Sequence, residues 1–347
     1  EVYEPDNLPQ TLTIPIEPHV YLTLPGEKIK PFLDILYELF DSSTLDENGT
    51  LTLSRFDAAA LADMESRNYG IFSIAGGDEL RALGQKLNDF TGIRKAFLPE
   101  GLKAELRNYQ QHGLNWLQFL REYQFAGILA DDMGLGKTLQ TLTHLLLEKE
   151  SGRMKLPSLV IAPTSLMGNW RREAERFTPG LKILTLQGTE RRKHFDRLNE
   201  YDLILTTYPL LPRDEQTLLN TEYYYLVLDE AQIIKNPKAK ASRIARKIKA
   251  PHRLCLTGTP MENHLGELWA LFDFLMPGFL GDSQRFRKLY RTPIETHGDT
   301  QQGARLARRV APFLLRRTKQ EVEKELPPKT EIIRSVPLHA NQAALYE

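Results

Sequence analysis

Between residues 125 and 150 an apolar run, a glycine-rich loop and an amphipathic stretch follow one another along the chain. This succession predicts a buried strand, a tight turn and a helix whose N-terminus faces the turn. The turn reads Asp131-Asp132-Met133-Gly134-Leu135-Gly136-Lys137-Thr138. Main-chain N–H groups of such a turn and of the helix N-terminus converge on one point, where they favour a phosphate group. The chain is therefore restricted to α/β folds that carry a phosphate-binding loop.

The residue types in this loop predict what each of them contacts. Gly134 and Gly136 allow the main chain to pass close to a β-phosphate, and Lys137 can reach β and γ oxygens. The Thr138 hydroxyl suits Mg²⁺. Asp131 stands where the general pattern G-x-x-x-x-G-K-[ST] has its first glycine. We predict a site for ATP and Mg²⁺, and the alternative is an ordinary strand-to-helix turn with an exposed lysine.

A second motif, Asp229-Glu230-Ala231-Gln232, ends the apolar run 224–228. Its carboxylates stand at the C-terminal tip of a predicted buried strand, where ligands of open α/β sheets bind. Phosphoryl transfer needs one carboxylate for hydrated magnesium and another to orient or deprotonate the attacking water. We assign Asp229 to the metal and Glu230 to the water. The alternative, a solvated acidic turn, is disfavoured by the phosphate loop about ninety residues earlier.

Predicted strands alternate with helical stretches after residue 98. The strands lie at 125–130, 158–162, 182–186, 202–206, 224–228 and 253–256. This alternation predicts a largely parallel sheet covered by helices on both faces. Further polar turns follow three of the strands, namely Pro163-Thr164-Ser165, Thr206-Thr207-Tyr208 and Thr257-Gly258-Thr259-Pro260. Each turn alone is consistent with a capped helix, but together they indicate one active edge of one sheet.

The composition indicates a folded chain without membrane-spanning segments. With 347 residues and 41% hydrophobic residues, the chain has room for two domains or one large domain with an appendage. No apolar run reaches the ~18 residues of a spanning helix, and the start Glu1-Val2-Tyr3-Glu4 lacks the features of a secretory signal. The single cysteine, Cys255, is predicted to be a core residue. We expect a cytoplasmic protein, associated with the nucleoid if its source is prokaryotic.

Charge is divided unevenly along the chain although it sums to zero. Residues 1–98 hold 8 Lys and Arg against 16 Asp and Glu, whereas residues 99–347 hold 37 against 29. The segment 235–253 contains eight basic residues and no acidic one. Such a run suits a surface that faces a polyanion, and it equally suits an ordinary solvated helix face.

Residues 1–98 are predicted to form a small α+β accessory region that joins the rest of the chain near 97–101. Within it, 12–24 alternates like short strands, 31–40 and 54–64 are typical of helices, and Asn48-Gly49 predicts a hairpin turn. The region carries no constellation of chemically active residues that the sequence reveals. We expect this region to be a candidate surface for a protein partner.

Over residues 99–347 the order of motifs resembles the first RecA-like lobe of the Swi/Snf family of helicase-related, DNA-dependent ATPases. The resemblance rests on residues 106–117, the phosphate loop, 161–170, 205–208, 256–260 and 313–319. It implies that the Gln110 amide pairs with the adenine edge of ATP. Further ATP contacts are implied for Arg107, Asp132, Met133, Gly134, Leu135, Gly136, Lys137, Thr138 and Asp229. The family's own loop is similar to this one, which accounts for Asp131, while Ala231-Gln232 replaces the Gly-His of many relatives, as is common in prokaryotic members.

The resemblance also implies duplex DNA as a partner, held mainly through its phosphates. Thr164, Ser165, Thr206 and Thr207 would hold phosphates of one strand. Residues 265–312 match the family's helical insertion, with helices expected at 268–275, 284–290 and 304–310. There Arg305, Arg308 and Arg309 form one basic helical stripe, which either contacts the duplex or is a solvated face.

The family pattern leads us to expect a second RecA-like lobe after residue 347. That lobe carries the arginine motif that completes the γ-phosphate site, and such an arginine is worth roughly 10³- to 10⁵-fold in turnover. The lobe present here is therefore expected to be nearly inactive alone. The resemblance implies the ATP-binding lobe of a duplex-DNA translocase or remodelling ATPase. An RNA helicase, disfavoured by the helical insertion, and a non-hydrolysing nucleic-acid clamp or recruiting module remain as alternatives.

Overall fold

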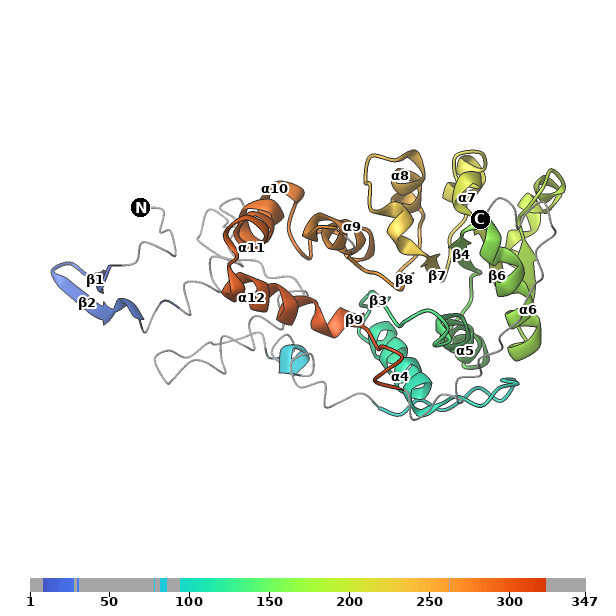
Figure 1. Cartoon of the computed structure of the whole chain (residues 1–347), viewed down its shortest axis with the longest axis horizontal. Helices are drawn as coiled ribbons and strands as arrows, with labels where there is room; N and C mark the ends of the chain where they lie inside the picture. Colours follow the sequence, from blue (N-terminus) through green and yellow to red (C-terminus); the bar gives the residue numbers. More distant parts are fainter. Residues whose placement is uncertain are drawn as a thin grey trace, which may run out of the picture.

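The computed structural model describes residues 9–27, 30, 78, 82–85, 94–261 and 263–322. From residue 94 onwards the chain forms a parallel sheet between two layers of helices (Figure 1). The strand order is β5-β6-β4-β7-β8-β3-β9. The strands are β3 (Gly127–Leu129), β4 (Ser158–Ala162), β5 (Ile183–Thr185), β6 (Leu203–Thr207), β7 (Tyr225–Asp229), β8 (His252–Leu256) and β9 (Leu314–Leu315).

Strands form where short, strongly apolar runs stand in the sequence. β4, β6 and β7 read SLVIA, LILTT and YLVLD, and every one of their positions is buried. Near-continuous apolar runs are typical of parallel strands that are covered on both faces. All six predicted strands are confirmed, with boundaries within two residues. The two-residue strand β9, which pairs with β3, was not predicted.

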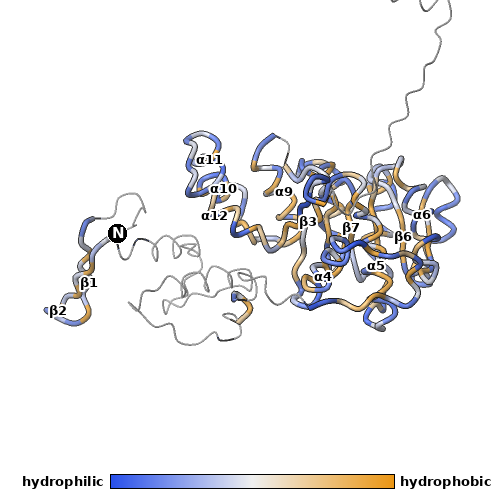
Figure 2. Tube along the Cα trace, turned by 60° about the horizontal axis from the view of Figure 1, so that its bottom comes forward, coloured by the Kyte–Doolittle hydropathy of each residue, from blue (hydrophilic) through white to orange (hydrophobic). Residues whose placement is uncertain are grey.

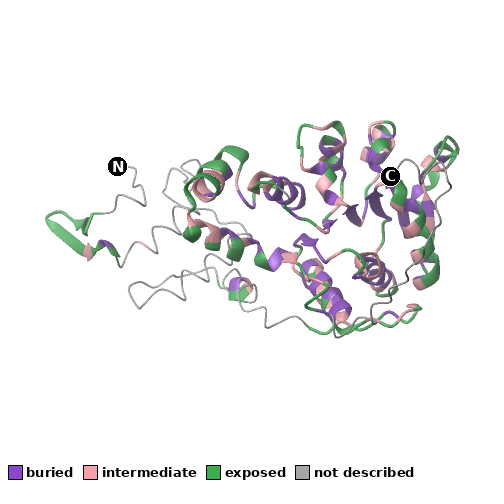
Figure 3. Ribbon diagram, in the orientation of Figure 1, coloured by how far each residue is buried: buried purple, intermediate pink, exposed green. Residues whose placement is uncertain are grey.

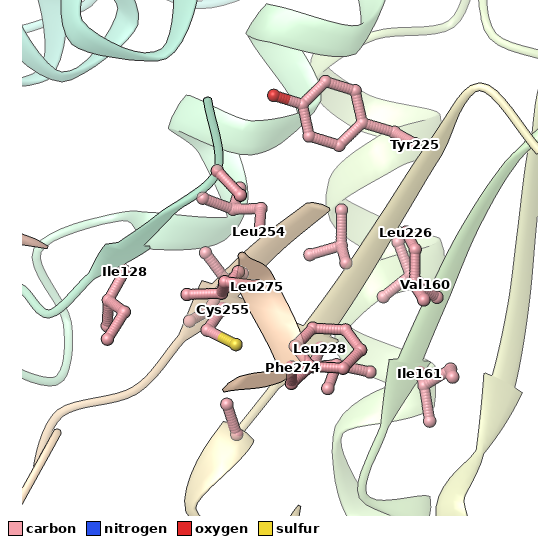
Figure 4. Packing of buried hydrophobic residues seen from close by; sticks show 14 of the residues in the cluster. Ile128, Val160, Ile161, Tyr225, Leu226, Leu228, Leu254, Cys255, Phe274 and Leu275 are labelled. Carbon is pink, nitrogen blue, oxygen red and sulfur yellow. The ribbon is translucent and has the colours of Figure 1, made fainter. Parts of the chain in front are cut away.

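Helices cover both faces of the sheet, as predicted. α4 (Asn108–Glu122), α5 (Lys137–Glu150) and α6 (Met167–Phe177) lie on one face, and α7 (Glu215–Asn220), α8 (Lys240–Lys247) and α9 (Leu265–Leu275) lie on the other (Figure 1). The strands are the buried centre (Figure 3), and hydrophilic residues dominate the outer loops (Figure 2). Figure 4 shows Leu228 of β7 beside Phe274 of α9, with Ile128 of β3 and Val160 of β4 in the same buried cluster.

Because the strands are parallel, their carboxyl ends meet at one edge of the sheet. The phosphate loop follows β3, the short 3₁₀ helix η3 (Thr164–Leu166) follows β4, and Tyr208 follows β6. Asp229 ends β7, and Thr257 follows β8. This arrangement confirms that the predicted polar turns share one edge.

The segment after β8 is helical, as expected for residues 265–312. After α9 come α10 (Ser283–Phe286), the π-helical turn η7 (Arg287–Arg291), α11 (Thr292–His297) and α12 (Thr300–Val310). α11 was not predicted. The chain returns to the sheet through Phe313, whose ring lies 4.9 Å from that of Phe125 and 5.1 Å from that of Phe279. The helical segment is thus fastened to the core at both of its ends.

The N-terminal region is described mainly by one hairpin. β1 (Thr11–Glu17) and β2 (Val20–Pro25) pair in antiparallel fashion, which confirms the short strands expected at 12–24. The helices expected at 31–40 and 54–64 and the turn at Asn48-Gly49 lie outside the described residues. The domain boundary near residue 98 stays a prediction.

Two expectations from composition can be compared with the structure. Cys255 is fully buried in β8, which confirms its place in the core. Across the part of the chain that the structure describes, no helix combines the length and apolarity needed to cross a bilayer.

A buried polar cluster lies at the amino edge of the sheet, opposite the strand tips. Glu148 of α5 is fully buried and accepts hydrogen bonds from Arg153, Gln118 and the Tyr224 hydroxyl. Burial by itself raises the pKa of the Glu148 carboxyl, but these donors, Arg153 foremost, bring it to about 2. His144, whose Nδ1 lies 2.9 Å from Gln118 Nε2, has its pKa lowered to about 4 by burial. This histidine is therefore neutral at pH 7.

His144 is expected to make the fold sensitive to acid. Its pKa is about 6.5 in the unfolded chain and about 4 in the folded one, so only the unfolded chain takes up this proton as the pH falls between these values. The free energy of unfolding should fall by about 3 kcal/mol across that window. His144→Gln should remove this loss, whereas His297→Gln, a change at an exposed histidine, should retain it. Urea unfolding between pH 7.5 and pH 4.5 measures the difference, and equal losses in both variants would contradict the assignment.

Candidate active site

The phosphate loop has the backbone that its glycines predict. Gly134 and Gly136 have φ values of 89° and 81°, and Gly136 caps the N-terminus of α5. A Cβ atom at Gly136 would lie 2.6 Å from Gln110 Nε2, so both conformation and space require glycine there. Lys137 Nζ donates to the main-chain oxygen of Asp131 at 2.6 Å. The lysine is thus folded across the loop, with its ammonium group beside the main chain that would surround a phosphate.

Gln110 connects the start of α4 to this loop. Its side chain is buried, its Oε1 accepts from the Arg107 main-chain N–H at 3.0 Å, and its Nε2 donates to the Leu135 main-chain oxygen at 3.3 Å. Arg107 is exposed at the N-cap of α4. Along the loop, Leu135 is buried, Met133 is 75% exposed, and Asp132, Lys137 and Thr138 are half-buried. The structure therefore brings the predicted adenine and phosphate contacts to one place, and their roles stay predictions.

Asp131, which replaces the first glycine of the general loop pattern, has a structural partner. Its carboxylate is fully buried, Arg317 Nε donates to Oδ1 at 2.8 Å, and Arg317 Nη2 donates to Oδ2. Arg317 also donates to Gln140 Oε1 at 2.8 Å and to the Tyr109 main-chain oxygen. A buried carboxylate needs such a partner. Arg317, which follows β9, ties the loop to the end of the described chain, and this pairing was not predicted from the sequence.

The acidic motif is held by hydrogen bonds on several sides. Asp229 is only 6% exposed; its Oδ1 accepts from the Glu230 main-chain N–H at 3.0 Å, and its Oδ2 accepts from Trp170 Nε1 at 2.8 Å. Burial raises the pKa of the Asp229 carboxyl, and the Trp170 indole opposes that shift. Glu230 has φ 50° and ψ 53°, a left-handed conformation that turns the chain sharply after β7. Asp229 thus ends the strand, and Glu230 stands at the sharp turn that follows it.

Gln232 links the acidic motif to the turn after β8. Its Nε2 donates to Glu230 Oε2 at 2.7 Å, and its Oε1 accepts from the Thr257 hydroxyl at 2.9 Å. The same Thr257 oxygen accepts from the Thr259 main-chain N–H at 3.0 Å. The amide thus bridges an acceptor and a donor, which a glutamine can do because it carries both groups. The departure Ala231-Gln232 therefore has a structural role that the sequence did not reveal.

The predicted phosphate-holding turns differ in accessibility. Thr164 and Ser165 are exposed in η3, where their hydroxyls can reach a ligand. Thr206 and Thr207 have buried side chains, and the Thr206 hydroxyl has no hydrogen-bond partner within the described structure. In this conformation, a phosphate contact at the turn after β6 would have to use main-chain groups.

The three arginines of α12 do not form a uniform stripe. Arg308 is exposed and Arg305 is half-buried. Arg309 donates from Nε and Nη2 to the Phe279 main-chain oxygen, at 3.2 and 2.9 Å, and its guanidinium lies 5.2 Å from the Phe279 ring centroid. Arg309 therefore fastens α12 to the preceding loop. Of the three arginines, Arg308 and Arg305 are therefore the ones whose positive charge could contact a binding partner.

The segment 235–253 is likewise only partly exposed. Arg253 donates to the main-chain oxygens of Phe274, Arg246 and Ile248, and Arg246 pairs with Asp273. Exposed lysines and arginines of this segment lie at Lys238, Lys240, Arg243, Lys247 and Lys249. Lys235 also pairs with Glu267 at 3.3 Å, so three of the eight basic residues help to stabilise the fold. The five exposed residues suit a polyanion-facing surface and a solvated helix face equally.

Comparison with known proteins places this geometry in a family. Residues 109–347 match the SNF2-related domain. The chain belongs to the SNF2 family. YwqA of Bacillus subtilis (strain 168), named as an ATP-dependent helicase/translocase, is 46% identical over 274 residues, which are 78% of this chain and 30% of YwqA. The TATA-binding protein-associated factor MOT1 of Saccharomyces cerevisiae is 42% identical over 280 residues, 74% of this chain and 15% of MOT1.

Solved SNF2 structures share the fold. The Sulfolobus solfataricus SWI2/SNF2 ATPase core in complex with dsDNA is 42% identical, with a TM-score of 0.61 over 65% of this chain and 47% of that one. A second structure, the Sulfolobus solfataricus SWI2/SNF2 ATPase core domain, is 40% identical, with a TM-score of 0.60 over 72% of this chain and 51% of that one. The resemblance seen in the sequence and the RecA-like fold are thereby confirmed. The chain spans less than a third of the two relatives named above and about half of the solved cores.

Proposed function

We propose that this SNF2-family lobe binds Mg-ATP and powers movement along duplex DNA, or remodelling of a complex on it, in the full-length protein. The observation that carries the proposal is the convergence of Lys137, Asp229 and Glu230 at one carboxyl edge of a parallel sheet. YwqA, a relative named for an ATP-dependent activity and 46% identical, supports the nucleotide, and a solved neighbour in complex with dsDNA supports the duplex.

The residues at this edge fit ATP and Mg²⁺. The left-handed glycines Gly134 and Gly136 open main-chain N–H groups toward a phosphate, and Lys137 would supply the cation beside it. Among the described residues no group of three or more His, Cys, Asp or Glu side chains could hold a metal alone. Mg²⁺ commonly binds one or two protein groups plus substrate phosphates, here Thr138 and Asp229. When bound, the ion would neutralise charge on the phosphates during transfer.

Glu230 is the group we assign to the attacking water. Its Oε2 accepts a hydrogen bond from Gln232 Nε2, which fixes the direction of the carboxylate, and Oε1 would face the water. Gln232 in turn contacts Thr257 after β8. An arginine from a second lobe would complete the γ-phosphate site, and an isolated first lobe is then expected to turn over ATP slowly.

Contacts with DNA are proposed at Thr164 and Ser165 and at Arg308 and Arg305 of α12. Hydroxyl and guanidinium groups of this kind hold a phosphate backbone without reading base sequence. A protein partner would bind outside this lobe, and residues 1–98 are the candidate surface for it. The same proposal includes a cytoplasmic location, associated with the nucleoid if the source is prokaryotic, and no contact with a membrane.

ATP turnover by the full-length protein tests the function directly. Turnover should be low without nucleic acid and rise when a duplex of random sequence is added, whereas single-stranded RNA at the same nucleotide concentration should have little effect. Stronger stimulation by RNA would favour the RNA helicase alternative. No turnover with either polymer, despite ATP binding, would favour a non-hydrolysing clamp.

The α12 contact predicts a change in the salt dependence of duplex binding. Each phosphate contact contributes about −0.9 to the slope of log affinity against log salt. The double variant Arg305→Ala/Arg308→Ala should therefore have a slope shallower by up to about 1.8 units. Arg192→Ala, at an exposed arginine outside the proposed surface, should keep the wild-type slope. Fluorescence anisotropy with a random duplex at several salt concentrations measures this, and an unchanged slope in the double variant would leave the helix as a solvated face.

A further inference from the structure

Trp170 makes a contact unlike those of the other two tryptophans. Trp116 Nε1 donates to the Pro312 main-chain oxygen and Trp269 Nε1 donates to the Gly281 main-chain oxygen. Such bonds satisfy a buried indole N–H in an ordinary core. Trp170 Nε1 instead donates to the carboxylate of Asp229 at 2.8 Å, across 59 residues of sequence. It is the only one of the chain's three tryptophans bonded to a group of the candidate active site.

A second buried donor reaches the same residue from a different strand. The Tyr208 hydroxyl donates to the Asp229 main-chain oxygen at 2.7 Å, and the Tyr208 side chain is 4% exposed. Tyr208 follows β6, while Trp170 lies in the first turn of α6 after β4. β4 stands between β6 and β7 in the sheet, so both donors approach the tip of β7 from the same side.

Each donor lies close in sequence to one of the two turns for which the family resemblance implies contacts with DNA phosphates. The exposed Thr164 and Ser165 lie in η3, which leads directly into α6 and Trp170. Tyr208 directly follows Thr206 and Thr207. Since both side chains are buried, a shift of either turn would move a donor of Asp229. A carboxylate can bind a metal only through lone pairs that are not already used in hydrogen bonds. In Asp229, Oδ1 and Oδ2 each accept one hydrogen bond. Trp170 therefore helps to orient the remaining lone pairs directly, whereas Tyr208 acts on the main chain that carries the carboxylate.

We propose that Trp170 and Tyr208 are positioning residues that orient Asp229 for Mg-ATP and couple its orientation to the two DNA-facing turns. This inference rests on the proposed function and deepens it, because it assigns the route by which duplex binding acts on the nucleotide site. Neither side chain touches the nucleotide in this assignment. Each acts through Asp229, as groups behind a metal ligand commonly do.

Nucleotide binding by the full-length protein, measured by calorimetry with a non-hydrolysable ATP analogue, tests the proposal. Affinities are compared in EDTA and in Mg²⁺, each with and without a random duplex. Trp170→Phe keeps an aromatic ring but removes the indole N–H, and Tyr208→Phe removes only the hydroxyl. In both variants the affinity gained from Mg²⁺ should fall about tenfold, the lower end of the range for groups behind a metal ligand. The affinity in EDTA and the affinity for duplex DNA without nucleotide should match the wild type.

Coupling between the two ligands is the decisive readout. If duplex DNA and nucleotide strengthen each other's binding by a common factor in the wild type, that factor should approach one in both variants. Trp116→Phe is the matched control, since it removes an equally buried indole donor in the same lobe, and it should retain both the Mg²⁺ gain and the coupling.

The outcomes separate the inference from the proposed function. Wild-type Mg²⁺ gain and coupling in Tyr208→Phe and Trp170→Phe would overturn the inference, as would an equal loss in Trp116→Phe, which would indicate a general packing effect. Should Trp170→Phe fail to fold, Tyr208→Phe carries the test. A wild-type protein that does not bind duplex DNA would overturn the proposed function, while the Mg²⁺ measurements would still decide whether Trp170 and Tyr208 orient Asp229.

Discussion

Lys137→Ala is expected to weaken ATP binding by about 100-fold or more. Removing one partner of a close charge pair costs about 2–5 kcal/mol, because the opposite charge is left without its counterion. In the described structure both hydrogen-bond acceptors of Lys137 are main-chain carbonyl oxygens, of Asp131 and Asp132. The ammonium group is therefore held at the loop by neutral groups, and its charge is available for phosphate. Calorimetric titration of the full-length protein with ATP measures the loss.

Lys155→Ala is a suitable control for that experiment. Lys155 is also a lysine of this lobe, but it is exposed beyond the end of α5, far from the carboxyl edge of the sheet. Its removal should leave ATP affinity at the wild-type value. An ATP affinity in Lys137→Ala equal to that of the control would show that the loop does not bind phosphate as assigned.

Glu230→Gln is expected to stop turnover while preserving ATP binding. A general base contributes typically about 10²- to 10⁴-fold to a rate, and glutamine has the shape of glutamate without a basic oxygen. The substituted amide oxygen can still accept the hydrogen bond that Gln232 Nε2 now gives to Glu230 at 2.7 Å, so the local structure should persist. The value of kcat in the presence of duplex DNA should fall by about this factor, with an unchanged dissociation constant for the nucleotide.

Glu175→Gln tests whether the effect is particular to Glu230. Glu175 lies exposed on α6, where its contact with Arg171 is 3.8 Å long and solvated. Loss of that carboxylate should not change kcat. Near-wild-type kcat in Glu230→Gln would mean that another group activates the water.

Much of the framework could be predicted because its causes are local. Apolar runs such as LILTT and YLVLD favour buried parallel strands wherever they stand, and Gly134 and Gly136 allow φ values that other residues rarely adopt. The parallel arrangement then required the polar turns to share an edge, and the structure confirms this. The short strand β9 was missed because two residues carry no periodicity, and their pairing depends on the neighbouring strand β3.

The sequence by itself determined the strand positions, the phosphate loop and the acidic motif of this protein, since each follows from residues within a few positions of one another. Tertiary structure alone decided which distant side chains hold these motifs. Trp170 reaches Asp229 across 59 residues and Arg317 reaches Asp131 across 186, and no local pattern indicates either pair. In the same way, Arg309 belongs to a basic stripe by its spacing, yet the fold turns its guanidinium onto the Phe279 carbonyl. A buried charge or donor takes the partner that packing brings within reach, and packing is decided by the whole chain.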